Sequence, residues 1–171
     1  MRSDFIIAIL VALLFVLAGC TTKIQGDDTE KKDDQTASQE KSTSQGTLTY
    51  SGKVLAGKTT PYIEFNEEDY SKALSENKII LLNFYANWCP ICKAEEPKAY
   101  AAYNELKLEN VVAFRVNYKD SQTDSFEESL AQKFQIPYQH TKVIIKDGKQ
   151  ILKTPDSWDK ARYIKELNSL A

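Results

Sequence analysis

Two cysteines three positions apart directly follow the most apolar stretch of the globular part of the chain. The run Ile79–Tyr85 reads IILLNFY, without alternation of polar and apolar residues. This pattern is typical of a strand that is covered on both faces. Residues 90–108 then place Ala99, Ala102, Tyr103 and Leu106 at helical spacing. Cys89 and Cys92 are therefore predicted to lie where a buried central strand passes into a helix.

Strand and helix signals alternate on both sides of this junction. Strands are predicted at 62–65, 79–85, 111–116, 142–145 and, after a tight turn at Asp147-Gly148, 150–153. Further helices are predicted with N-caps at Asn66, Ser125 and Ser157. The second places Phe126, Leu130 and Phe134 on one face, and the third is predicted to bury Ile164, Leu167 and Leu170. Residues 47–60 form either a short edge strand or no strand. Parallel crossovers followed by an antiparallel hairpin predict an α/β fold, a central mixed β-sheet flanked by helices on both faces.

The first twenty residues have the pattern of an export signal. Arg2 precedes an apolar run at 5–18, which is short for a membrane span and of the usual length for a signal-peptide core. The run ends in Leu-Ala-Gly-Cys20, which resembles the lipobox of prokaryotic lipoproteins and implies a lipid on Cys20. Asp4 leaves the basic region only weakly positive, and an uncleaved anchor or an ordinary signal peptide are the alternatives. Either leading interpretation predicts an extracytoplasmic domain, lipid-anchored to the cell membrane if Cys20 is acylated.

A polar linker is predicted between this signal and the globular domain. Residues 21–45 contain almost nothing apolar, so they cannot bury enough surface to offset the entropy of ordering. Segment 21–46 has six acidic and four basic residues, whereas 47–171 has seventeen of each. A domain without net charge gives no reason to expect a nucleic-acid partner. The predicted division is a lipoprotein signal peptide at 1–19, a lipidated cysteine with a flexible linker at 20–46, and a domain at 47–171.

The position of the cysteine pair favours thiol chemistry. At the start of a helix, Cys89 lies beside unpaired backbone amides and the positive end of the helix dipole, which favours its thiolate. Cys89 is thus the predicted nucleophile, and Cys92, one turn on, is predicted to resolve the mixed disulfide. Pro90 suits an early helical position, where its missing N–H is harmless.

Two structural roles for the pair are less well supported. A structural zinc site usually needs four ligands, and the chain has a single histidine. A static disulfide would close too short a loop to stabilise the fold much. With Cys20 lipidated, no multiple-disulfide framework is possible either. We therefore assign no metal ion, and no cofactor beyond a redox-active Cys89–Cys92 disulfide.

The stretch FYANWCPICK at 84–93 resembles the active-site motif of the thioredoxin superfamily, and Pro97 matches the proline that kinks that family's active-site helix. The resemblance covers residues 62–171 and implies a thioredoxin-like fold and thiol-disulfide oxidoreductase activity on protein substrates. The pattern is most similar to the extracytoplasmic, membrane-tethered reductases that serve cytochrome c maturation and related thiol pathways. That similarity implies a reductant more than an oxidant, resupplied by a membrane electron donor.

Two departures from cytoplasmic thioredoxin bear on proton transfer. Asn83 stands where thioredoxin has a buried aspartate, as it does in the membrane-tethered relatives. Those relatives often carry an acid three residues after the second cysteine, a position that Glu95 matches. If it is buried, Glu95 is expected to accept the proton of Cys92 during resolution. The alternative is a solvated helix residue, the usual state of a glutamate.

A third departure concerns the loop that faces the disulfide in this family. An alignment without gaps puts His140, instead of the family's cis-proline, immediately before Thr141. Otherwise Pro137 is that proline and three inserted residues follow it. We favour replacement, because the distance from the loop to the hairpin turn is then kept.

A histidine beside the sulfurs leaves different functions open. In electron exchange, His140 would tune Cys89. Alternatively, Cys89, Cys92 and His140 form a soft three-ligand copper site, resembling the copper-delivering lipoproteins of oxidase assembly, although those use a wider cysteine spacing. His140 could also be a polar loop residue without a special role. The cysteine spacing favours electron exchange.

Three aromatic residues complete the set of candidates. Trp88 is predicted to lie on the active-site surface beside the nucleophile, and Trp158 is predicted to pack in the first turn of the last helix. Tyr138 is expected either to line a groove for a partner chain or to be ordinary loop surface.

Overall fold

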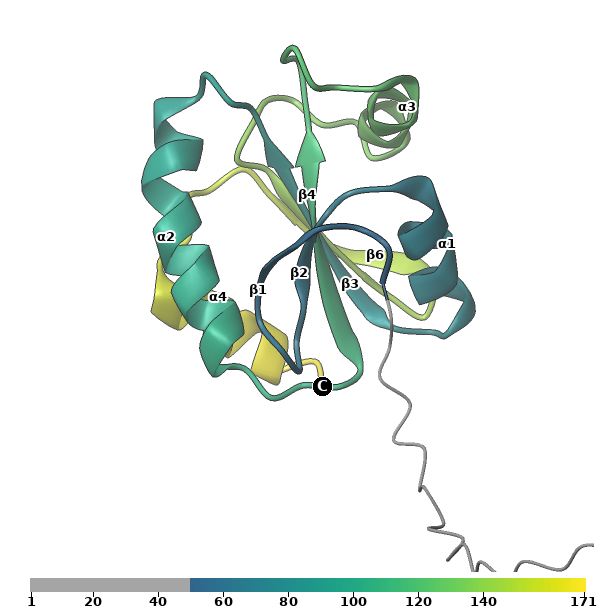
Figure 1. Ribbon diagram of the computed structural model, residues 1–171, viewed down its shortest axis with the longest axis vertical. Helices are drawn as coiled ribbons and strands as arrows, with labels where there is room; N and C mark the ends of the chain where they lie inside the picture. Colours follow the sequence, from purple (N-terminus) through teal and green to yellow (C-terminus); the bar gives the residue numbers. More distant parts are fainter. Residues whose placement is uncertain (1–49) are drawn as a thin grey trace, which may run out of the picture. The chain divides into compact units, whose positions relative to one another are not determined.

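A six-stranded sheet in the order β1-β2-β4-β3-β5-β6 is the centre of the fold (Figure 1). The computed structural model describes residues 50–171. The strands are β1 (Val54–Ala56), β2 (Tyr62–Glu64), β3 (Ile79–Tyr85), β4 (Val111–Asn117), β5 (Lys142–Lys146) and β6 (Lys149–Thr154). The helices are α1 (Glu67–Ser75), α2 (Pro90–Glu105), α3 (Ser125–Lys133) and α4 (Lys160–Asn168). Strands β2, β4 and β3 are parallel, whereas β1, β5 and β6 pair antiparallel with their neighbours.

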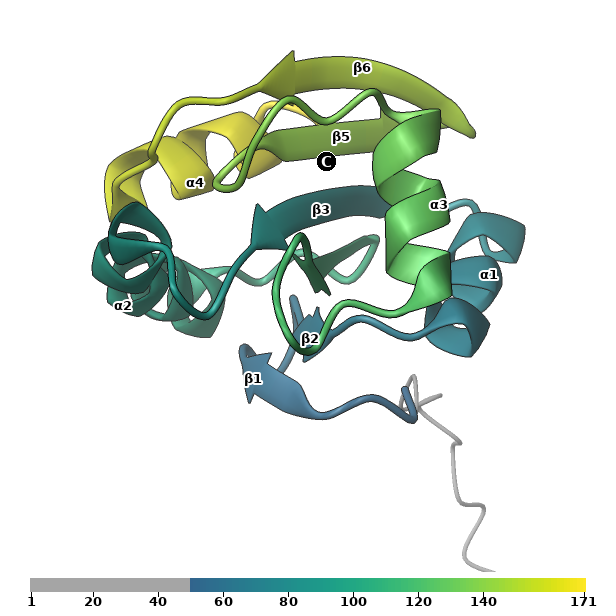
Figure 2. The ribbon, with the colours of Figure 1, turned by 90° about the horizontal axis from the view of Figure 1, so that it is seen from above.

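Helices cover both faces of this sheet, with α2 and α4 on one side and α1 and α3 on the other (Figure 2). Successive residues of β3 therefore enter different cores. Ile80, Leu82 and Phe84 pack in the core beneath α1 and α3, and Ile79 and Leu81 pack in the core beneath α2 and α4. This double burial is why the sequence of β3 shows no alternation. The predicted α/β fold, with a mixed sheet between two helical layers, is confirmed.

Two helix N-caps differ from the prediction, because neighbouring aspartates cap the helices. Helix α3 begins at Ser125, but its N-cap is Asp124, which accepts hydrogen bonds from two backbone amides and forms a capping box with Glu127. Helix α4 is capped by Asp159, which accepts from the Arg162 amide. The predicted cap at Ser157 is wrong, because residues 155–159 have no regular structure and the helix begins at Lys160. Serine and aspartate are both good N-caps, and the sequence offers both at each of these places.

The remaining differences concern element ends. Helix α2 stops at Glu105, because the backbone of Leu106 is extended with φ −63° and ψ 143°. Segment 47–60, which had two alternatives, contains the short edge strand β1. Asp147 and Gly148 have φ of 51° and 70°, the left-handed values that a type I′ turn requires, and the predicted tight hairpin turn is confirmed.

No helix between residues 50 and 171 combines the length and the apolar character needed to cross a membrane. The predicted signal peptide, Cys20 and the whole linker lie outside the described residues.

Candidate active site at the start of helix α2

Strand β3 delivers Cys89 to the N-terminus of helix α2. Cys89 is the N-cap residue, with extended backbone angles, and its Sγ accepts a hydrogen bond of 3.2 Å from the amide of Cys92. Its own amide donates to the carbonyl of Ala86, which closes the turn after the strand. Pro90 is the first helical residue, where no intrahelical partner for an N–H is needed. One sulfur is thus held at the amide-rich end of the helix.

The two cysteines are thiols with different environments. Their Sγ atoms lie 2.6 Å apart, with the Cys92 thiol donating to Cys89, and each residue is only 4% exposed. Burial, and secondly the hydrogen bond to Cys89, raise the pKa of Cys92 to about 12. Cys92 therefore keeps its proton at neutral pH, and two donors converge on the sulfur of Cys89.

The loop before the helix is fastened to the turn after strand β4. Trp88 donates from Nε1 to the carbonyl of Lys119 at 2.9 Å, and the amide of Asn87 donates to the carboxylate of Asp120 at 2.9 Å. The indole nevertheless remains 55% exposed. Ile91 and Tyr138 are also exposed large side chains, so apolar surface flanks the cysteine pair.

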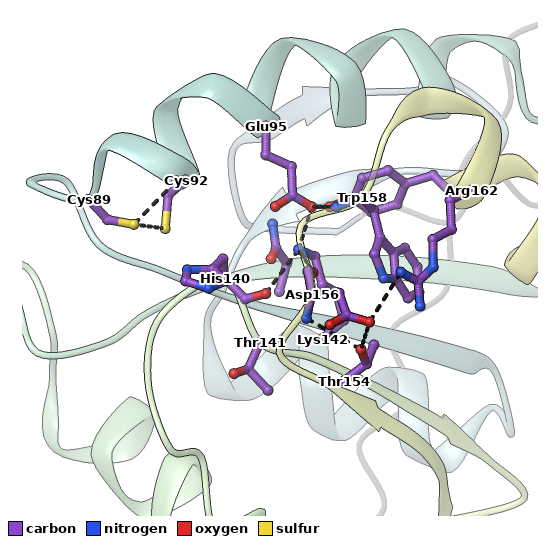
Figure 3. A network of polar contacts seen from close by, with 12 residues as sticks. Cys89, Cys92, Glu95, His140, Thr141, Lys142, Thr154, Asp156, Trp158 and Arg162 are labelled. Carbon is purple, nitrogen blue, oxygen red and sulfur yellow. Dashed lines mark hydrogen bonds and ion pairs between the residues drawn. The ribbon is translucent and has the colours of Figure 1, made fainter.

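His140 lies beside the two sulfurs. One side-chain atom from each of Cys89, Cys92 and His140 falls within a 4.8 Å span (Figure 3). His140 has φ 55°, and its amide donates to the carbonyl of Phe84 at 2.7 Å. A proline could neither take this φ nor donate this hydrogen bond, since its ring holds φ near −65° and it has no N–H. Pro137 lies three residues earlier on the exposed surface.

The imidazole of His140 is held in its neutral form. Burial, and secondly the positive charge of Lys142, lower the pKa of His140 below its ordinary value. Its Nδ1 is buried and has no hydrogen-bond partner among residues 50–171. A neutral imidazole close to two thiols can accept a proton or bind a soft metal ion.

Glu95 is buried one turn after Cys92, so of the two alternatives the solvated helix residue is wrong. The residue is 2% exposed. Its Oε1 accepts from the amide of Trp158 at 3.0 Å and from the hydroxyl of Tyr163 at 2.6 Å, and it forms an ion pair with Lys142 (Figure 3). Its second oxygen, Oε2, is buried and unpartnered within the described part of the chain.

Lys142 is the site residue that sequence reasoning missed. Its side chain is fully buried, and its ammonium donates to the carbonyls of His140 and Asp156 at 2.9 Å and 3.0 Å. Burial lowers the pKa of Lys142, and the carboxylate of Glu95 opposes that effect. The only signal in the sequence was a lysine at the start of an otherwise apolar predicted strand. No local pattern shows that such a charge points inward.

Trp158 and Asn83 fill supporting positions. Trp158 is fully buried, as predicted for a packing residue, but it precedes helix α4 instead of lying in its first turn. Asn83 donates from Nδ2 to the hydroxyl of Tyr62 at 2.9 Å inside the sheet. The buried carboxylate near the pair is therefore that of Glu95 on the helix, while the central strand contributes a neutral amide.

Comparisons with known proteins agree with this geometry. The chain is 39% identical over 74 residues to the thiol:disulfide interchange protein DsbE of Vibrio cholerae, covering 39% of this chain and 37% of the relative. It is 32% identical over 72 residues to DsbE of Escherichia coli K12, with the same coverages. The chain thus spans little more than a third of the length of these relatives.

The fold and the family are shown by two further comparisons. The crystal structure of thioredoxin from Aeropyrum pernix superposes with a TM-score of 0.53 at 16% identity, covering 73% of this chain and 98% of that one. The model of the thioredoxin family matches residues 61–169. The chain therefore belongs to the thioredoxin family, and Cys89 and Cys92 form the Cys-x-x-Cys motif of that family's thiol-disulfide oxidoreductases.

Proposed function

We propose that this protein is a membrane-anchored, extracytoplasmic thiol-disulfide oxidoreductase that exchanges disulfides with protein substrates. The observation that carries the proposal is the environment of the Cys89 sulfur. It caps helix α2 and accepts hydrogen bonds from both the amide and the thiol of Cys92, which stabilises a thiolate. The exposed side chains of Trp88, Ile91 and Tyr138 offer a substrate chain apolar contact beside it.

Exchange proceeds in two displacements at sulfur. The Cys89 thiolate attacks one sulfur of a substrate disulfide, and the other substrate sulfur leaves as a thiolate that takes a proton from solvent. Cys92 then gives up its proton and attacks Cys89, and the second substrate sulfur leaves and is protonated. Two electrons pass from the dithiol to the substrate, and Cys89 and Cys92 end as a disulfide.

Glu95 is the proposed acceptor of the Cys92 proton. Because the pKa of Cys92 is raised to about 12, this thiol needs a base before it can attack. Glu95 lies one turn further along the same helix face, and its Oε2 has no partner among the described residues. The neutral ring of His140, on the loop that faces the sulfurs, is proposed to tune the reactivity of Cys89.

Replacing Cys92 with serine should trap the first intermediate. Without the resolving thiol, the bond between Cys89 and the substrate persists, so full-length Cys92→Ser expressed in cells should form mixed disulfides that run as high-mass bands on non-reducing gels. Reductant should release them, and Cys89→Ser/Cys92→Ser should form none. If the single variant yields no adducts while the protein is abundant, disulfide exchange with proteins is excluded as its function.

The proposed direction is reduction of substrates, with electrons resupplied by a membrane donor. The resemblance of the active-site motif to that of tethered reductases supports this direction. We expect the Cys89–Cys92 pair to equilibrate with glutathione at a potential more negative than about −200 mV, the range of reducing members of this fold. A value near about −120 mV, which is that of a strong oxidant, would reverse the assignment.

The proposed anchor is a lipid on Cys20. Cells grown with a labelled fatty acid should incorporate label into the wild-type protein and into Cys89→Ala, and Cys20→Ala should carry none and leave the membrane fraction. A Cys20→Ala protein that remains in the membrane at full length would point instead to an uncleaved anchor.

Binding of cuprous ion is a second candidate function, because Cys89, Cys92 and His140 bring two sulfurs and a ring nitrogen within 4.8 Å of one another. Thiolate and imidazole suit a soft monovalent ion, and Nδ1 of His140 lacks a competing hydrogen bond among residues 50–171. Here copper would be cargo for delivery.

Titration of the reduced full-length protein with cuprous ion tests this candidate. The expected result is a one-to-one complex that the oxidised protein does not form, because the disulfide removes both thiolates. His140→Ala should weaken binding by about tenfold or more, since even residues behind the ligands change affinity by that factor. The control Tyr138→Ala alters an exposed neighbour of His140 and should bind like wild type. Equal binding by His140→Ala would remove this histidine, and with it the copper candidate.

A further inference from the structure

The ammonium group of Lys142 has three N–H donors and lies against three acceptor groups. It forms an ion pair with the carboxylate of Glu95 and donates to the backbone carbonyls of His140 and Asp156. A lysine ammonium has three N–H bonds, so every donor is used. The side chain has no exposed surface, and the rings of Trp158 and Tyr163 lie 5.8 Å and 6.0 Å from the nitrogen. The group is therefore a buried positive charge with a fixed position.

These acceptors belong to different segments that frame the cysteine pair. Glu95 lies on helix α2 one turn after Cys92, and His140 lies on the loop that faces the sulfurs (Figure 3). Asp156 lies between strand β6 and helix α4. Lys142 itself begins strand β5, next to β3, which ends just before the active-site loop. One side chain thus joins the active-site helix, the facing loop and the C-terminal segment.

We infer that Lys142 is a positioning residue for disulfide exchange: its ammonium holds the Glu95 carboxylate below Cys92 and the backbone of His140 against the sulfurs. The inference concerns the exchange reaction alone, so it rests on that part of the proposed function and not on the anchor or the direction.

The hydrogen bonds around His140 show what Lys142 fixes. The amide of His140 donates to Phe84 on strand β3, and its carbonyl accepts from Lys142. Both peptide groups of this left-handed residue are therefore tied to the sheet. A non-glycine residue in this conformation persists only where its surroundings hold it. Loss of the Lys142 bond should release the carbonyl side and let the imidazole move away from Cys89 and Cys92.

The charges of Lys142 and Glu95 have opposite effects on the reduction potential of the two cysteines. Lys142 interacts electrostatically with Cys92, and Glu95 lies on helix α2, which contains Cys92 and is capped by Cys89. A positive charge near the pair stabilises the thiolate of the dithiol state and raises the reduction potential, and a negative charge does the reverse. Together the two charges largely cancel, so removal of either one should leave the other uncompensated.

A cycle of variants tests this inference through the equilibrium with glutathione. In Glu95→Gln the charge of Lys142 remains, so the dithiol should be favoured by about tenfold, a rise of about 30 mV. In Lys142→Met the charge of Glu95 remains, so the shift should be of similar size and opposite sign. The double variant Glu95→Gln/Lys142→Met should return to within about twofold of wild type, a coupling that distant or independent sites do not show.

Lys146→Met is the matched control. Lys146 lies on the same strand and donates to the carbonyl of Leu170 at 2.7 Å, but it contacts neither Glu95 nor the His140 loop. It should keep the wild-type potential. Hydrogen exchange of the His140 amide should be faster in Lys142→Met and unchanged in Lys146→Met, because only the first variant loses the bond to the His140 carbonyl.

The outcomes separate the inference from the function on which it rests. Single variants whose potentials move in the same direction, or a double variant that matches Glu95→Gln, would overturn the role of Lys142. If Lys142→Met does not fold, Glu95→Gln and the double variant still decide, since only one of them should differ from wild type. A wild-type protein that forms no reversible disulfide with glutathione would overturn the exchange reaction itself.

Discussion

Hydrogen bonds from the first turn of helix α2 to the sulfur of Cys89 are the interaction on which the site depends. They form only because strand β3, paired on both sides and buried on both faces, brings the chain to the helix start at a fixed place. Helix α2 is in turn held on the sheet by Ala99, Ala102 and Tyr103. The packing of the core and the reactivity of one thiol are therefore linked through a single strand-to-helix junction.

Features encoded in short stretches of sequence could be predicted. The continuous apolar run of β3, the cysteine spacing and the Asp147-Gly148 turn each depend on neighbouring residues, and all three lie where they were expected. Helix caps were less predictable, because Asp124 and Ser125 are adjacent and both residue types suit the position. Here the backbone path decides which side chain reaches the free amides.

The buried ion pair could not be predicted, because its partners are far apart in the sequence. Glu95 had two open interpretations, and only its packing against Trp158 and Tyr163 separates them. The burial of Lys142 could not be expected, since a lysine at the beginning of a strand usually points to solvent. The position of His140 followed from a count of residues to the hairpin turn, but its left-handed backbone depends on contacts with Phe84 and Lys142.

The buried ion pair of Glu95 and Lys142 needs an explanation other than the stability of the fold. Removing one partner of a buried ion pair typically costs about 3–5 kcal/mol, whereas replacing both by apolar residues is often neutral or even stabilising. Stability alone therefore does not require charges at Glu95 and Lys142. On the central strand the chain carries the neutral contact between Asn83 and Tyr62. The buried carboxylate and ammonium beside the cysteines therefore come from helix α2 and strand β5, and not from the central strand β3.

The contacts of Glu95 with Trp158 and Tyr163 connect helix α4 and the segment before it to helix α2, on which Cys92 lies. Until this segment docks on helix α2, the Glu95 carboxylate lacks two of its hydrogen-bond donors, the amide of Trp158 and the hydroxyl of Tyr163. The surroundings of Glu95 are therefore complete only when helix α4 has packed on the sheet beside helix α2.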